Sequence, residues 1–265
     1  MVIKEMTERS PTIEEFAAAA LPQMKARTAK LEWQGRQIWL KKSVPPKGTG
    51  WTLLQRVFAA IISLPILRPT ANPGGAEGLR IEVWRSAEFR RAGFIVPEIL
   101  GQGDNWIAMS DLGEMVERKM QKDATMDNAA RHALICRCAV ALAEAHKAGL
   151  SHGRAKLNDF VLTPDNKIGF IDFEEDVDTS RIPLHDRQAR EIWLFTCSAG
   201  QFGRAAAEKG WEAYRAVYHD KRVMKSLRRF MRLLAPLTIM ARPFRGMMKG
   251  DAARAFDGTA LLRKV

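Results

Sequence analysis

One stretch, residues 149–176, constrains the fold of this chain more than any other: G-L-S-H-G-R-A-K-L-N-D-F-V-L-T-P-D-N-K-I-G-F-I-D-F-E-E-D. Its first glycine predicts the end of a helix, and the polar residues 152–159 predict a loop. Residues 164–166, Pro-Asp-Asn, predict the turn of a β-hairpin whose second strand ends near Asp172. Such a hairpin would bring Asp159 and Asp172 together at its mouth.

The composition is that of a globular protein, with 46% hydrophobic and 27% charged residues in a chain of 265. This length allows one large domain or two lobes. The net charge of +12 favours an anionic partner, such as a phosphate-bearing ligand, an anionic lipid surface or a nucleic acid, without choosing among them. Cys136, Cys138 and Cys197 lack metal-ligand spacing, so we expect reduced core thiols in a cytosolic protein.

The sequence predicts no membrane-spanning helix. Its first residues include acids and no apolar run, unlike a secretory signal. The longest apolar stretch, residues 57–67, contains Ser63 and Pro65 and is well short of the ~20 residues that a span needs. We therefore expect a soluble protein, or one that lies at a membrane surface.

The first half of the chain predicts strands and one long helix. Residues 1–28 are expected to form a helical extension, and strands at 30–33 and 36–42 follow, joined by a tight turn at Gln34-Gly35. Residues 43–78, rich in Pro and Gly around an apolar segment at 51–67, are interpreted as an insertion. A helix at residues 79–92 and two short strands then complete this half. The predicted apolar face of that helix comprises Ile81, Trp84, Ala87, Phe89 and Ala92.

Helices dominate after residue 123. The apolar periodicity predicts them at residues 126–148, 184–199, 202–218 and 221–240. The chain is therefore predicted to be α+β, with a small strand-rich part at residues 29–113 and a larger, mainly helical part at 114–265.

Four short motifs occur in a fixed order: I-W-L-K ending at Lys41, M-S-D-L-G starting at Met109, H-G-R-A-K-L-N-D starting at His152, and I-D-F-E around Asp172. Asp172 follows His152 by 20 positions, the interval between the catalytic-loop histidine and the metal-binding aspartate of kinases. In this order the motifs resemble the protein-kinase-like superfamily, and within it the bacterial lipopolysaccharide-core (heptose and Kdo) kinases. The resemblance covers about residues 31–199. It implies a bilobal kinase-like fold, with a small β-rich N-lobe containing one helix and a larger helical C-lobe, that binds ATP and Mg²⁺ between the lobes.

The resemblance implies a nucleotide site in the strand-rich part. Lys41 would contact the α- and β-phosphates and Glu82 would hold its ammonium group, while Met109 and Asp111 belong to the hinge whose backbone binds adenine. Strand alternation places Ile38, Leu40 and Lys42 on one face, so Lys42 remains an alternative to Lys41. Solvated lysines at a strand end and a solvated glutamate are the simpler interpretations. A glycine-rich phosphate loop is not visible, because Gly35 is the only glycine between Lys30 and Lys41.

The same resemblance assigns roles in the catalytic loop. Asp172 takes the position of the main metal ligand and Glu174 that of the usual glycine. The loop positions are His152 for the structural histidine, Arg154 for the catalytic base, Lys156 for the γ-phosphate lysine and Asp159 for the metal-binding asparagine. Carboxylate oxygens suit Mg²⁺, so Asp159 and Asp172 form the predicted metal site.

Arg154 departs from the kinase pattern, which has aspartate at this position. A guanidinium stays protonated and has no acceptor, so it cannot take a proton from a substrate hydroxyl. Loss of a positioned general base typically costs ~10²- to 10⁴-fold in rate. Arg154 could instead pair with Asp172 or Asp159, or bind an anionic group of a substrate.

The remaining polar residues have less specific signals. The acidic run Glu174-Glu175-Asp176 fits a solvated turn or a second metal contact. By the resemblance, Glu191 would brace the catalytic loop. The histidines outside that loop have no ligand-like spacing and are interpreted as structural or exposed: His132, His146, His185 and His219.

A basic amphipathic segment starts at Lys221, where six Lys and Arg residues alternate with apolar ones. It suits an anionic membrane surface, or the outer helix of the helical part with a solvated face. The apolar segment at residues 51–67 either adds to membrane association or packs on the strand-rich part. Beyond charge, no motif supports nucleic-acid binding.

Two functions follow as expectations. The first is an ATP- and Mg²⁺-dependent phosphotransferase, impaired by Arg154, that acts on a sugar or lipid-linked hydroxyl; this acceptor class comes from the resemblance. The second is a pseudokinase that binds nucleotide or nothing and acts as a regulator or scaffold near the membrane. Nucleic-acid binding is disfavoured against both. The expected location is the cytoplasm, with the cytoplasmic face of the inner membrane as the site of action.

Overall fold

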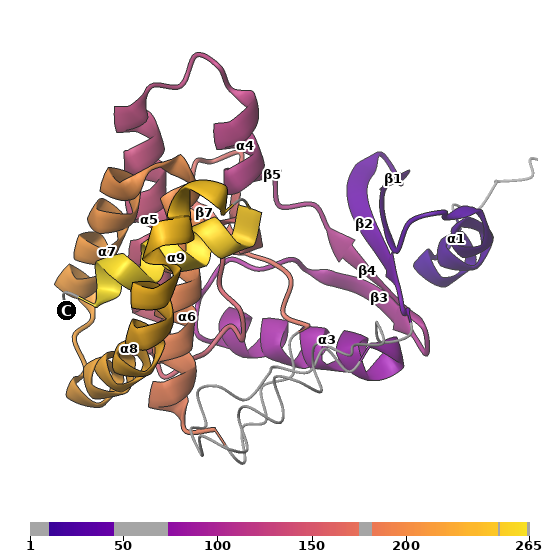
Figure 1. Ribbon diagram of the computed structural model, residues 1–265. Helices are drawn as coiled ribbons and strands as arrows, with labels where there is room; N and C mark the ends of the chain where they lie inside the picture. The colour runs from indigo at the N-terminus through magenta and orange to yellow at the C-terminus, as the bar shows by residue number, and fades with distance from the viewer. Residues whose placement is uncertain (1–10, 45–73, 175–181, 249, 264–265) are drawn as a thin grey trace, which may run out of the picture.

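The computed structural model describes residues 11–44, 74–174, 182–248 and 250–263. Within them the chain is α+β, as predicted, with a small antiparallel sheet in its N-terminal part and helices in its C-terminal part (Figure 1). The apolar segment predicted at residues 51–67 lies outside the described residues, as do Glu175 and Asp176. No helix of the described ranges combines the length and hydropathy needed to cross a bilayer.

Among the described residues, the N-terminal sheet contains four antiparallel strands in the order β1-β2-β4-β3. They are β1 (Thr28–Trp33), β2 (Arg36–Lys42), β3 (Ile99–Gly103) and β4 (Trp106–Ser110). The predicted tight turn joins β1 to β2: Gln34 and Gly35 both have positive φ, 49° and 71°, as a two-residue hairpin loop of type I′ requires.

The described part of the N-terminal extension packs on this sheet. Helix α1 (Ile13–Ala20) begins with a capping box between Thr12 and Glu15, and a short 3₁₀ turn, η1 (Leu21–Gln23), follows it. Ile13 is buried against a sheet face that includes Ile38 and Leu40. Because side chains alternate along a strand, Trp39 and Lys41 point to the opposite face of the sheet.

Helix α3 (Gly75–Arg91) lies on that opposite face and begins four residues earlier than predicted. Its predicted apolar face is wrong, because Trp84 is 50% exposed. The buried positions include three polar residues, Glu82, Arg85 and Ser86, together with Phe89. The ion pair of Glu82 with Lys41 and the hydrogen bond of Arg85 to the His152 carbonyl stabilise this face of the helix, so hydrophobicity alone indicated the wrong side.

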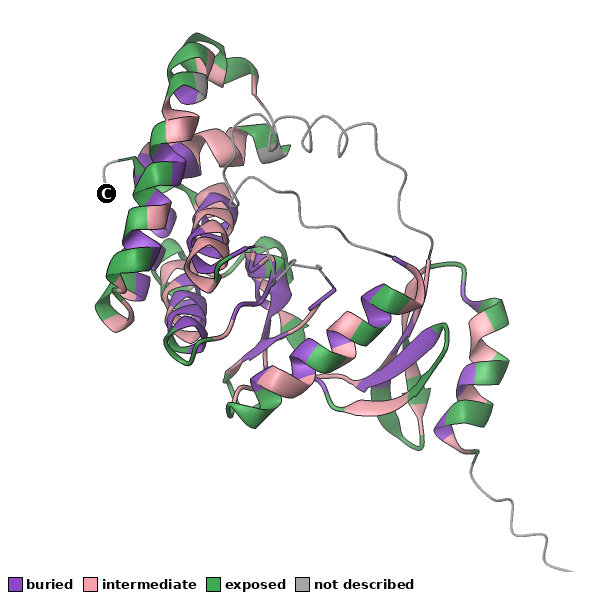
Figure 2. Ribbon diagram, turned by 90° about the horizontal axis from the view of Figure 1, so that it is seen from below, coloured by how far each residue is buried: buried purple, intermediate pink, exposed green. Residues whose placement is uncertain are grey.

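In the described residues of the C-terminal part, six helices pack around one apolar cluster. They are α4 (Val116–Lys122), α5 (Asn128–Lys147), α6 (Leu184–Ala199), α7 (Arg204–Val217), α8 (Lys221–Ala241) and α9 (Gly250–Leu262). Short 3₁₀ segments occur at η3 (Leu157–Asp159), η4 (Gly200–Phe202) and η5 (Arg242–Met247). Figure 2 shows buried residues on one side of the helices and exposed residues on the other. Cys136, Cys138 and Cys197 are free thiols.

A second, three-stranded sheet connects the two parts: β5 (Glu114–Met115), β6 (Phe160–Leu162) and β7 (Ile168–Phe170). The predicted hairpin is β6-β7, and Asn166 in its turn has φ 59°. Strand β7 ends at Phe170, two residues before Asp172, so Asp172 lies in the loop that follows.

Candidate functional site

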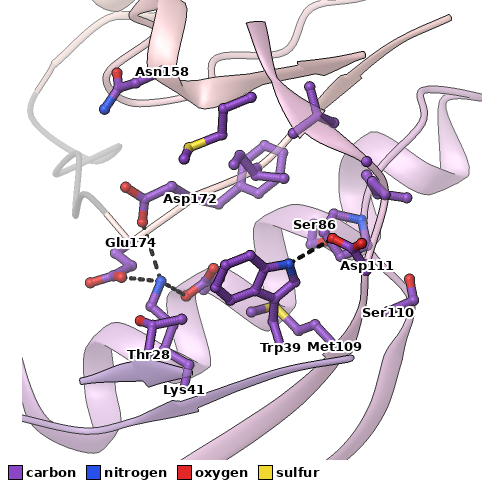
Figure 3. Close-up of a pocket in the computed structure, with 18 of the residues that line it drawn as sticks. Thr28, Trp39, Lys41, Ser86, Met109, Ser110, Asp111, Asn158, Asp172 and Glu174 are labelled. Carbon is purple, nitrogen blue, oxygen red and sulfur yellow. Dashed lines mark hydrogen bonds and ion pairs between the residues drawn. The ribbon is translucent and has the colours of Figure 1, made fainter. Parts of the chain in front are cut away.

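A pocket of about 350 Å³ lies between the N-terminal sheet and the loops around β6 and β7 (Figure 3). Residues from four distant parts of the sequence line it, among them Trp39, Glu82, Asp111, Asn158 and Asp172. The pocket therefore exists only when the sheet, α3, the link at residues 110–113 and the β7 loop are assembled.

Lys41, and not Lys42, enters the pocket. Its Nζ lies 2.7 Å from Glu82 Oε2 and 3.2 Å from Asp172 Oδ1, and it also pairs with the Glu174 carboxylate (Figure 3). Lys42 is on the α1 side of β2, where its Nζ donates to the carbonyl of Met24 at 2.6 Å. The alternation that places Ile38 and Leu40 toward α1 thus directs Lys41 into the pocket.

This cluster of charges changes the titration of its members. Burial alone would lower the pKa of Lys41, but the three carboxylates around it raise that pKa above its usual value. Burial raises the pKa of Glu82 to about 7. The negative charges of Asp172 and Glu174 also raise this pKa, whereas the positive charge of Lys41 lowers it. Lys41 therefore remains an ammonium, while Glu82 titrates near neutral pH.

Glu174 is a second buried partner of Lys41, with 4% of its surface exposed. Glu174 also pairs with Arg27, whose Nη2 lies 2.5 Å from Glu174 Oε2. The interpretation of Glu174 as part of a solvated turn is therefore wrong. The sequence did not indicate Arg27, because nothing local to it signals a partner 147 positions away.

The link between the two parts of the fold borders the pocket. Met109 faces the pocket from the end of β4, and residues 110–113 line it. The Asp111 carboxylate accepts from Trp39 Nε1 at 2.8 Å and pairs with Lys30 at 2.7 Å. The side chain of Asp111 is thus engaged by β1 and β2, and its backbone N–H donates to the Gln37 carbonyl at 3.3 Å.

His152 is buried and has a structural contact. Its Nε2 lies 2.9 Å from the Ile171 carbonyl, to which it donates, and its ring lies 4.5 Å from that of Phe173. Burial lowers the pKa of His152 to about 4, so the ring is neutral at physiological pH. Arg85 of α3 adds a second support, because its Nη1 donates to the His152 carbonyl at 3.0 Å.

Glu191 of α6 braces the same loop. Its carboxylate accepts from the backbone N–H groups of His152 at 3.0 Å and Gly153 at 2.8 Å. Ser151 Oγ, at 2.5 Å, and His146 Nε2, at 3.0 Å, complete its partners. Burial would raise the pKa of Glu191, but the hydrogen bond and charge of His146, with further contributions from His152 and Ser151, lower it to about 2. Glu191 is therefore an ionised, fully bonded anchor, and His146 has the structural role predicted for it.

Arg154 pairs with Asp172, the first of the contacts considered for it from the sequence. Its Nη2 lies 3.3 Å from Asp172 Oδ2. Burial alone would raise the pKa of Asp172, but the charges of Lys41 and Arg154 hold it well below its usual range. Asp172 has φ 67°, a left-handed conformation that is uncommon outside glycine and is concentrated at functional sites.

Asp159 does not belong to the closest group of carboxylates among the described residues. The carboxylate oxygens that gather within 4.8 Å of one another belong to Glu82, Asp172 and Glu174, with Lys41 paired to all three. Asp159 Oδ2 instead accepts from the Lys156 backbone at 2.8 Å. Burial and the charge of Asp172 raise the pKa of Asp159 well above its usual value, so the two carboxylates still interact.

The donor chemistry of this region suits Mg²⁺. Asp159 Oδ1 is buried and has no hydrogen-bond partner among the described residues, which is the kind of atom that a cation would satisfy.

Lys156 does not line the pocket. Asn158, two positions further along the chain, does line it, and the sequence did not indicate this residue.

Comparison of the sequence with models of known protein families finds no match, and comparison with curated proteins finds no similar sequence.

Proposed function

We propose that this chain is a kinase-like protein of the lipopolysaccharide-kinase type that binds ATP and Mg²⁺ in the pocket around Lys41. One observation carries the proposal: a strand lysine, held at 2.7 Å by a glutamate of helix α3, pairs with a carboxylate at the end of a hairpin. A lysine in such a setting can exchange its carboxylate partners for the phosphates of a nucleotide.

The other residues fit around that assignment. The backbone of residues 110–113 would bind adenine, with Met109 beside it. Asp172 and Asp159 would hold Mg²⁺, which neutralises charge on the phosphates when bound. The neutral ring of His152 and the ionised carboxylate of Glu191 keep the loop in place, and neither residue lines the pocket.

As an enzyme, the protein would transfer the γ-phosphate to a sugar or lipid-linked hydroxyl at the cytoplasmic face of the inner membrane. That acceptor class rests on the resemblance alone. Phosphoryl transfer depends largely on positioning and electrostatics, so turnover without a base is slow but chemically possible. Arg154 supplies no acceptor for the proton of the hydroxyl.

A second candidate function, a pseudokinase, is favoured by the Arg154–Asp172 pair. A guanidinium on Asp172 neutralises one of the carboxylates that would bind the metal. In that case the pocket binds nucleotide without transfer, and the protein acts through a partner as a regulator or scaffold.

Thermal shift with ATP, in the presence and absence of Mg²⁺, tests the proposal on the full chain. We expect ATP to stabilise the wild type and Lys42→Met, and to have no effect on Lys41→Met. The unliganded variants are first compared by circular dichroism, and Asp172→Asn provides a second test if Lys41→Met does not fold. Equal stabilisation of all four proteins, or of none, would contradict a nucleotide site at Lys41.

Phosphate release from ATP then separates the two functions. Wild-type turnover that Asp172→Ala abolishes supports the phosphotransferase and excludes the pseudokinase. Binding without turnover in the wild type supports the pseudokinase.

A further inference from the structure

The end of α8 and the η5 turn expose four large apolar side chains. Ile239, Met240, Phe244 and Met247, which we call the apolar tip, are 59%, 73%, 59% and 79% exposed. Of the strongly exposed large apolar side chains in the described part of the chain, Trp84 on α3 is the only other. Four such residues within nine positions form a local patch of the kind that marks an interaction surface.

The apolar tip is not an extension of the core. The first half of α8 buries its apolar side, including Val223, Leu227 and Phe230, in the main cluster. That half is therefore the outer helix of the helical part, and its apolar residues are not available to a membrane. The apolar tip lies beyond Pro236, which interrupts the hydrogen bonding of the helix.

A stripe of cations leads to the apolar tip along the exposed side of α8. Lys225, Arg228, Arg229 and Arg232, the basic stripe, are exposed, and no ion pair involves them within the described ranges. Spacings of three and four residues place Arg229 and Arg232 on the side of the helix that continues to Ile239 and Met240. Residues 221–248 contain no Asp or Glu.

We propose that the apolar tip and the basic stripe form a docking surface for an anionic lipid bilayer. The apolar tip enters the boundary between headgroups and acyl chains, and the basic stripe contacts the lipid phosphates. This surface is separate from the nucleotide pocket and does not depend on the proposed function.

The charges and exposed apolar side chains of this surface indicate which kind of partner it binds. A second copy of the chain docked face to face would bring one basic stripe against another, with no acid in residues 221–248 to compensate. A nucleic acid would explain the basic stripe but not the four exposed apolar side chains, because phosphate contacts need none. An anionic bilayer accounts for both features.

Co-sedimentation of the full chain with vesicles tests the proposal, using phosphatidylcholine alone and phosphatidylcholine mixed with phosphatidylglycerol. The tip variant is Met240→Ser, Phe244→Ser and Met247→Ser together; the stripe variant is Arg228→Gln, Arg229→Gln and Arg232→Gln together. All six positions are exposed, so we expect both variants to fold. The matched controls are Trp84→Ser for lost apolar area and Arg118→Gln, Lys122→Gln and Lys147→Gln for lost charge.

We expect the wild type and both controls to bind the anionic vesicles, less at about 500 mM salt than at about 50 mM. Partitioning should fall about tenfold or more in the stripe variant at low salt, and by a similar factor in the tip variant. Absence of wild-type retention on anionic vesicles at low salt would overturn the proposal. Binding by the tip variant equal to that of the wild type would also overturn it.

Two further readouts test the rival occupants. A wild-type dimer in light scattering that the tip variant converts to a monomer, without vesicle binding, would make the surface an interface between copies. Retention on a nucleic-acid duplex but not on vesicles, lost in the stripe variant, would make it a nucleic-acid site. Either result overturns the proposal.

Discussion

The guanidinium of Arg154 lies 3.3 Å from Asp172 Oδ2, while Lys41 Nζ approaches the other oxygen of the same carboxylate at 3.2 Å. Asp172 is thus held between two cations from different parts of the fold. A Mg²⁺ ion at Asp172 would compete with Arg154 for one oxygen and with Lys41 for the other. Arg154, which replaces the expected catalytic base, therefore also pairs with Asp172, the expected metal ligand.

Arg154→Asp should raise phosphate release from ATP by about 10²-fold if the protein is a phosphotransferase, because it supplies the missing base. Arg154→Ala serves as the control, since it frees Asp172 without providing an acceptor. An increase that is equal in the two variants would mean that the lost cation, and not the gained base, is responsible. No increase in Arg154→Asp would count against the kinase assignment of this position.

The free energy of unfolding should depend on pH because Glu82 titrates. Its pKa is about 7 in the folded protein against 4.5 as a reference, so its contribution is fully present below about pH 4.5 and is lost as the pH rises through about 7. The free energy of unfolding of the wild type, relative to Glu82→Gln, should therefore fall by about 3 kcal/mol over this window.

Urea unfolding at several pH values measures this difference. Glu77→Gln, exposed on the same helix, should follow the wild type at every pH. A constant difference between the wild type and Glu82→Gln would show that Glu82 does not titrate in this range.

Glu191→Gln should destabilise the protein by about 3 kcal/mol at pH 7, because an amide cannot accept from all the donors that face this carboxylate. The pKa of Glu191 is lowered from 4.5 to about 2, so the contribution is present above about pH 4.5 and is lost as the pH falls through about 2. Glu144→Gln, exposed on α5, is the control for urea unfolding. A loss no larger than that of the control would contradict the bracing role.

Gly113→Ala tests how closely the two parts of the fold approach. Gly113 has φ +130°, and a Cβ there would collide with the Leu162 carbonyl oxygen. We expect a loss of about 3 kcal/mol or more in the free energy of unfolding. Gly149→Ala, at φ +80° with open space around it, should cost only about 1 kcal/mol. Similar losses at the two positions would mean that only backbone strain matters.

Local patterns in the sequence predicted the elements that surround the site. The Gln34-Gly35 hairpin, the β6-β7 hairpin and the helix at residues 184–199 depend on turn chemistry and periodicity, which nearby residues determine. The resemblance to kinases also indicated Lys41 with Glu82. It did so through the order of motifs, because a glutamate on a charged helix has no distinguishing signal of its own.

Only the tertiary structure decided which charges meet. Alternation along β2 places Lys41 and Lys42 on opposite faces of the sheet but does not determine which of them faces the pocket. The packing of Ile38 and Leu40 against α1 determines it. The Arg27–Glu174 pair and the polar buried side of α3 arise from contacts between distant segments, which no local pattern records. Composition and spacing therefore determine the elements and their order, whereas the burial of opposite charges against one another determines the site, because that energy exists only once the segments are assembled.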